Sequence, residues 1–233
     1  MLEGTVYGRW PQRSEPINTV CEQLLKTLKC LQATHPKMSD WFLGGEAIGQ
    51  NISGSTSSSS DFRVVHDALE RNVVSKSDGR TSPHLGRRIT LFGGPPAESQ
   101  NYSVALRVTC CKCGEYSGEN TFNVSLPSVG CSALELRRLS TITDIIKCFA
   151  TIWRPRWIVF RDLSQQAGMP SGNNRPHTGV VTYRSDLRLE SVPTIDGVEI
   201  RELNVGGLLI YPTEVPLDPS KFILKVQSVL AAR

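Results

Sequence analysis

The chain has 233 residues, of which 39% are hydrophobic and 21% are charged, and its formal net charge is +4. A chain of this length and composition can bury a sizeable core without disulfides or metals, so we expect a single domain over residues 1–233. Its lysines and arginines are scattered rather than clustered, which argues against a dedicated nucleic-acid binder.

The N-terminus has no basic segment followed by an apolar run, and no apolar stretch reaches the roughly eighteen residues that span a bilayer. We therefore expect a cytoplasmic protein. The cysteines agree with a reducing compartment, because Cys21, Cys30 and Cys148 fall on the apolar faces of predicted helices, where a thiol packs as a small hydrophobic group.

The first part of the chain predicts alternating strands and helices. Residues 4–10 alternate weakly, like a strand, and residues 15–33 repeat apolar side chains every three or four positions, like a helix that ends before Pro36. A short strand is predicted near Trp41. The run QNISGSTSSSSD is too polar to pack and predicts a loop, after which Ser60 or Asp61 is expected to cap a second helix.

The second part of the chain is rich in predicted strands. RITLF, YSVALRVTC and NTFNVSLP predict an antiparallel meander, a helix is predicted over 133–153, and RWIVF and GVVTYRS predict two further strands. Asp196-Gly197 predicts a tight hairpin turn, VGGLLIYP predicts a late strand with Gly206-Gly207 as a bulge or close contact, and Asp218 is expected to cap a last helix. Since no βαβ repeat is visible, we expect an α+β fold with a mainly antiparallel sheet and packed helices.

The segment TCCKCGE carries three of the seven cysteines: Cys110, Cys111 and Cys113. Structural zinc sites prefer Cys-x-x-Cys pairs, and this spacing differs, so we expect neither a metal nor a cofactor. A metal-binding or enzymatic domain built on these cysteines and His177 is nevertheless the alternative hypothesis. No histidine or glycine pair stands in a catalytic or nucleotide-binding motif, so no catalytic residue is predicted and the chain is not expected to be an enzyme.

The segment TIWRPRWIVFRD surrounds Pro155 with tryptophan and arginine. The apolar pattern favours a corner between a helix and a strand, with the tryptophans partly buried. A contact surface is the second interpretation, because tryptophan and arginine are enriched at binding hot spots, and a nucleic-acid-binding corner is a third. The candidate partner-binding residues are Arg154, Arg156, Trp157, Arg9 and Trp10.

Two longer segments, VYGRWPQRSEPINTVCEQLLKTLKCLQATHPKMSDWF and VGGLLIYPTEVP with the following DPSKFILKVQSVLAA, resemble an immunity-protein family of bacterial polymorphic toxin systems. Members of that family are encoded beside toxins with a restriction-endonuclease-like nuclease domain. The resemblance implies a non-enzymatic α+β inhibitor of a type VI secretion effector, which acts in the cytoplasm of the producing cell. Its implied partner is the cognate toxin, with no membrane and no direct nucleic-acid contact, and homo-oligomerisation stays open.

The net charge of +4 bears on how such an inhibitor would act. Nuclease inhibitors are often acidic, because they compete for a surface built to bind phosphate. A chain with this charge is expected to bind away from the nucleic-acid groove or to disturb assembly of the toxin, unless its scattered acidic residues form a local patch.

Overall fold

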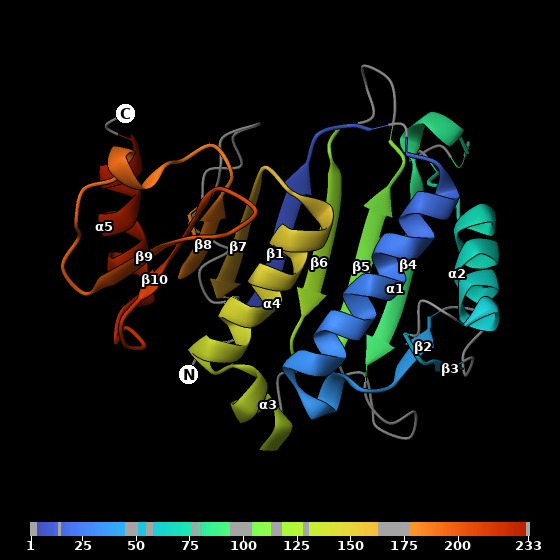
Figure 1. Ribbon diagram of the computed structural model, residues 1–233, viewed down its shortest axis with the longest axis horizontal. Helices are drawn as coiled ribbons and strands as arrows, with labels where there is room; N and C mark the ends of the chain where they lie inside the picture. Colours follow the sequence, from blue (N-terminus) through green and yellow to red (C-terminus); the bar gives the residue numbers. More distant parts are fainter. Residues whose placement is uncertain are drawn as a thin grey trace.

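The computed structural model of the protein (Figure 1) describes residues 4–13, 15–44, 51–54, 58–75, 79, 81–93, 104–112, 118–127, 131–162 and 178–231. In these ranges ten strands form one sheet, in the order β3-β2-β4-β5-β6-β1-β7-β8-β10-β9. Every neighbouring pair is antiparallel, which confirms the expected α+β class.

The strands are β1 (Gly4–Trp10), β2 (Trp41–Leu43), β3 (Asn51–Ile52), β4 (Arg87–Gly93), β5 (Val104–Cys110), β6 (Asn120–Ser125), β7 (Trp157–Asp162), β8 (Val181–Arg184), β9 (Val198–Glu202) and β10 (Leu208–Pro212). The helices are α1 (Ile17–Thr34), α2 (Ser59–Arg71), α3 (Cys131–Leu136), α4 (Leu139–Trp153) and α5 (Pro219–Ala231), with short 3₁₀ turns at Pro36–Met38, Pro83–Leu85 and Leu189–Ser191.

The first strand lies in the middle of the sheet. Tyr7 of β1 is opposite Asn123 of β6 on one side and Val159 of β7 on the other. The predicted meander, now β4, β5 and β6, is confirmed and pairs in sequence order next to β1. β1 therefore joins the meander to the C-terminal strands.

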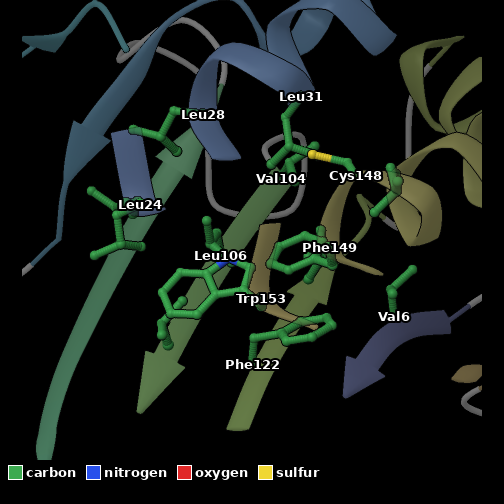
Figure 2. Close-up of a cluster of buried hydrophobic side chains, with 14 of the residues drawn as sticks. Val6, Leu24, Leu28, Leu31, Val104, Leu106, Phe122, Cys148, Phe149 and Trp153 are labelled. Atoms are coloured by element: carbon green, nitrogen blue, oxygen red, sulfur yellow. The ribbon is translucent and has the colours of Figure 1, made fainter. Parts of the chain in front are cut away.

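Helices α1 and α4 lie side by side across one face of the sheet (Figure 1). Leu24 and Leu28 of α1 and Phe149 and Trp153 of α4 point toward the strands and are buried (Figure 2). Trp153 Nε1 donates a hydrogen bond of 2.8 Å to Thr27 Oγ1, which ties the two helices together inside the core.

The predicted helix over 133–153 is two helices, α3 and α4. Arg138 has extended backbone angles, φ −62° and ψ 140°, and breaks the helix. Arg137 beside it is 5% exposed, and its Nη2 donates to the carbonyl of Pro127 at 2.7 Å. The apolar spacing continues through the break, which is why the sequence pattern does not reveal it.

Two local expectations near the second helix also change. The polar run 50–61 contains β3, which pairs with β2, so it is not wholly a loop. Helix α2 begins at Ser59 and is capped by Ser58, whose hydroxyl accepts from the backbone N–H of Asp61 at 3.2 Å. At the C-terminal helix the expected cap is confirmed, because Asp218 Oδ1 accepts from the N–H of Lys221 at 3.1 Å.

The hairpin between β9 and β10 turns at Gly206-Gly207 rather than at Asp196-Gly197. Gly206 and Gly207 have φ values of +84° and +79°, and Leu203 bonds across the turn to both glycines. Asp196-Gly197 does form a tight turn, closed by the N–H of Val198 donating to the carbonyl of Ile195 at 3.0 Å, but this turn leads into β9 and does not connect the two strands of a hairpin. A glycine pair can make either a turn or a bulge, and the tertiary pairing of β10 decides between them.

The two glycines of this turn provide a matched test of the hairpin. A Cβ on Gly207 would lie 2.5 Å from the carbonyl oxygen of Arg184, whereas a Cβ on Gly206 would meet nothing within 4 Å. Gly206→Ala is expected to cost about 1–2 kcal/mol for the left-handed conformation, and Gly207→Ala about 1–3 kcal/mol more for the backbone clash. Urea unfolding measures both, and equal midpoints would contradict this packing.

Candidate partner-binding surface

The two faces of the central strands differ in their surroundings. On β1, Val6 and Trp10 point to α1 and α4 and are fully buried. Thr5, Tyr7 and Arg9 alternate with them and point to the opposite face, where they are only half-buried. The sheet thus has one face that α1 and α4 cover and a second face on which the side chains of β1 are only half-buried.

Helix α5 covers this second face at one end of the sheet only. Val226 of α5 packs with Leu208 and Ile210 of β10, in a small cluster separate from the main core. Figure 1 shows α5 beyond β8, well away from β4 and β5. In the described part of the chain, no helix lies over the second face between β4 and β7.

We call this region the open face. Its strands are β4, β5, β6, β1 and β7, and its side chains are those of Arg88, Thr90 and Phe92; Ala105, Arg107 and Thr109; Thr121, Asn123 and Ser125; Thr5, Tyr7 and Arg9; and Trp157, Val159 and Arg161.

The open face carries arginine on most of its strands. Arg88 and Arg107 are exposed, and Arg9 and Arg161 are half-buried. Among the described side chains of these strand positions there is no carboxylate. The pairing register places Arg88 and Arg9 in one row across the sheet and Arg107 in the next row. The positive charges are therefore spread over the face instead of being confined to one strand.

Arg9 is held in place by aromatic side chains. Its Nε donates to Tyr7 Oη at 2.7 Å, and its guanidinium carbon lies 5.5 Å from the ring centre of Tyr7 and 5.7 Å from that of Trp157. Glu119 is the nearby carboxylate, at 3.9 Å between Oε2 and Arg9 Nη1. This long ion pair offsets only part of the local positive charge.

Arg161 and Lys112 add charge to the same region. The guanidinium carbon of Arg161 lies 5.6 Å from the ring centre of Tyr7, and its Nε and Nη2 are buried without a hydrogen-bond partner among the described residues. Burial, and then repulsion by Arg9, lower the pKa of Arg161. Burial lowers the pKa of Lys112 as well, followed by repulsion from Arg9 and Arg88. We call Arg9, Arg88, Arg107, Lys112 and Arg161 the basic cluster.

The predicted corner adjoins the open face. Arg154 and Arg156 are exposed, and Arg154 ends α4 in the left-handed conformation, with φ 46° and ψ 56°. Arg13 Nη2 donates to the carbonyl of Trp153 at 3.0 Å and to that of Arg154 at 3.3 Å. The N–H of Arg156 donates to the carbonyl of Arg9 at 2.8 Å, which joins the corner directly to β1.

The tryptophans of the candidate set are buried. Trp10 is fully buried on the helix-covered face, 5.0 Å from Trp153 between ring centres. Trp157 is 2% exposed and lies beneath Arg9 on the open face. Neither indole is accessible for the direct partner contact considered from the sequence, because both are covered by their neighbours. Arg9, Arg154 and Arg156 remain as members with surface-accessible charge.

Sequence reasoning missed Arg88, Arg107 and Arg161 as candidates. Arg88 and Arg107 stand at outward positions of alternating strands, and that alternation is visible in RRITLFG and VALRVTC. Arg161 follows the continuous apolar run of β7, so no alternation marks it. What the sequence does not show is that β4, β5, β1 and β7 belong to one continuous face, or that the helices cover the other face.

The cysteines at the end of β5 do not form a metal site within the described residues. Cys110 is fully buried and is the last residue of β5, and Cys111 directly after it has a positive φ of 57°. A hydrogen bond with Cys111, together with burial, raises the pKa of Cys110 well above its ordinary value, so this thiol is a poor metal ligand. Cys113 and His177, which complete the alternative hypothesis, lie outside the described residues. Within the described ranges, no three His, Cys, Asp or Glu side chains are grouped to hold a metal ion.

None of the helices in the described segments is both long enough and apolar enough to cross a membrane.

Comparisons with known proteins point to a family. No curated protein matches this chain in sequence. The chain is similar in structure to the Pseudomonas aeruginosa T6SS protein PA0821, with a TM-score of 0.53 and 12% sequence identity over 99% of this chain and 76% of that one; at this identity the likeness concerns the fold alone. The family model for Immunity protein 52 matches residues 4–223, which include every described strand and the first five residues of α5. The protein therefore belongs to the Immunity protein 52 family.

Proposed function

We propose that this protein binds and neutralises a toxin delivered by a type VI secretion system, in the cytoplasm of the cell that makes both. The observation that carries the proposal is the family match over residues 4–223, because an immunity protein implies a toxin partner. The likeness of its fold to a T6SS protein agrees with that setting.

The proposal extends to the kind of toxin. The N-terminal and C-terminal segments resemble immunity proteins that are encoded beside nucleases, which favours a nuclease as the target. Inhibition is proposed to be stoichiometric, without turnover. Such an inhibitor must dissociate slowly from the toxin, which requires high affinity. A nanomolar Kd corresponds to a binding free energy of about −12 kcal/mol.

Binding energy of that size usually comes from a few well-placed anchors. Exposed arginines are suited to this role, because a guanidinium presents several hydrogen-bond donors in a fixed plane. Arg154 and Arg156 at the corner are proposed as contacts, together with Arg9, whose side chain is 33% exposed. Trp157 is proposed to act indirectly, because its ring lies under the guanidinium of Arg9 and helps to hold that side chain in position.

Co-expression with the toxin domain encoded beside this gene tests the proposed function. Cells that make the toxin are expected to grow only when the wild-type protein is present, and Arg154→Glu/Arg156→Glu is expected to reduce the protection. Lys29→Glu/Lys37→Glu is the matched control, because both lysines are exposed on the helix-covered side and the change in charge is the same. Growth inhibition that wild type does not relieve would refute the function, and full protection by the corner variant would remove the corner from the interface.

A further inference from the structure

We propose that the open face is the surface on which this protein binds its toxin, and that the toxin presents an acidic protein surface to it. The inference rests on the proposed function, since it assumes that a toxin is bound. It adds the location of the interface and the charge of the partner.

The charge of the open face is complementary to an acidic partner. Arg88, Arg107 and Arg9 project from three strands of the open face, and Glu119 is the carboxylate described at its margin. Clustered like charges repel one another, so the free protein carries an electrostatic cost that an acidic partner would relieve. A complementary surface also accelerates association and rejects partners of the wrong charge.

The open face is broad and adjoins the corner. Its accessible part spans the four strands from β4 to β1, which at the usual spacing between strands is about 15 Å, because Trp157 and Val159 of β7 are 2% and 0% exposed. A typical stable interface buries about 800 Å² on each partner, and the adjoining corner extends the face with the exposed side chains of Arg154 and Arg156. The backbone bond between Arg156 and Arg9 makes the two regions continuous.

Two arginines of the open face are held in position before a partner binds. Arg9 is fixed by Tyr7 and Trp157, and Arg161 is fixed over Tyr7, before any partner arrives. Side chains that are already ordered lose less conformational entropy on binding. Residues on a sheet are also held more rigidly than residues on a loop, which suits an interface that must dissociate slowly.

The aromatic side chains argue for a protein partner over a single-stranded nucleic acid. Surfaces that bind single strands expose aromatic rings on which bases stack. Here Trp157 is 2% exposed, and guanidinium groups lie over the rings of both Trp157 and Tyr7. These rings support arginines and are not available as stacking platforms.

A basic binding surface also restricts where the protein can dock on a nuclease. A groove that attracts phosphate is positively charged, and the basic cluster would be repelled by it. The protein is therefore expected to dock on a different, acidic part of the toxin, in keeping with its net charge of +4.

The test measures binding of the purified toxin domain from the neighbouring gene to three forms of the full chain. The forms are wild type, Arg88→Glu/Arg107→Glu on the open face, and Lys29→Glu/Lys37→Glu as the control with the same change in charge. Arg88 and Arg107 are exposed, so the fold should persist. If the charge reversal prevents folding, binding of the toxin domain is measured with Arg88→Gln/Arg107→Gln instead.

Reversal on the open face is expected to raise the Kd about 100-fold, mostly through slower association, because like charges are then juxtaposed. The control should bind like wild type. Raising the salt from 0.1 to 1 M shortens the screening length from about 10 Å to about 3 Å, so it should weaken wild type markedly and the glutamine variant less.

Three results would overturn the inference. Equal binding by all forms would leave the proposed function standing and remove the open face from it. Failure of wild type to bind the toxin would remove both proposals. Loss of binding to a short DNA duplex in Arg88→Glu/Arg107→Glu, with toxin binding unchanged, would assign the face to nucleic acid instead.

Discussion

Replacing Leu24 or Leu28 by alanine is expected to lower the free energy of unfolding by about 2–5 kcal/mol in each case. Both side chains are fully buried where α1 meets the sheet (Figure 2). Alanine removes apolar atoms and leaves a cavity that the surrounding strands close only in part. Chemical denaturation, monitored by circular dichroism, measures the change.

Lys29→Ala is the control for these two substitutions. Lys29 lies on the same helix and is exposed, so its replacement should change stability by no more than about 0.5 kcal/mol. If the leucine variants unfolded at the same denaturant concentration as this control, the packing of α1 on the sheet would be incorrect.

Phe149→Ala is expected to be the most damaging single change, at about 3–5 kcal/mol. Phe149 of α4 is fully buried and stacks on Phe122 of β6, with ring centres 3.9 Å apart and planes 14° from parallel. The substitution removes the ring of Phe149 and also leaves one face of the Phe122 ring without its packing contact. Since Trp153 lies in the same cluster, tryptophan fluorescence will follow the unfolding (Figure 2).

Phe149→Leu separates loss of volume from loss of the ring. Leucine refills much of the space, so this variant should retain about half or more of the lost stability, because conservative hydrophobic exchanges usually cost less than about 1.5 kcal/mol. Equal destabilisation by leucine and alanine would mean that the contact between Phe149 and Phe122 contributes little.

The local elements were largely predictable from the sequence. The apolar stripe of α1 contains Leu24 and Leu28, and the structure buries both. Alternation in β4, β5 and β6 predicted their antiparallel pairing. These signals are local, because periodicity depends only on which side chains share one face of one element.

The arrangement of distant elements was not predictable in the same way. β1 pairs with β6 and β7, whose residues lie more than one hundred positions later in the chain. The pattern of residues 4–10 does not indicate which strands those partners are. The break at Arg137 and Arg138 is accompanied by a hydrogen bond from Arg137 to the carbonyl of Pro127, which sequence spacing does not indicate. Tertiary contacts override local patterns in both cases.

The candidate surface shows the same limit. Trp10 and Trp157 have the composition of a binding hot spot, yet they also continue apolar patterns, and the structure buries them. Arg88 and Arg107 are unremarkable in the sequence, and it is the order of the strands that places them on the same face of the sheet as Arg9. A surface formed by five strands is visible only once their pairing is known.

The central claim is that this protein neutralises a toxin by binding it. The most direct measurement is a titration of the purified nuclease toxin with the full chain, at toxin concentrations far above the Kd, with cleavage of a fluorescent DNA or RNA substrate as the readout. The account predicts that activity falls linearly and reaches zero at a fixed stoichiometric ratio, independent of incubation time. Activity that persists at a large excess of the protein, or that is lost progressively at a small fraction of an equivalent, would contradict it.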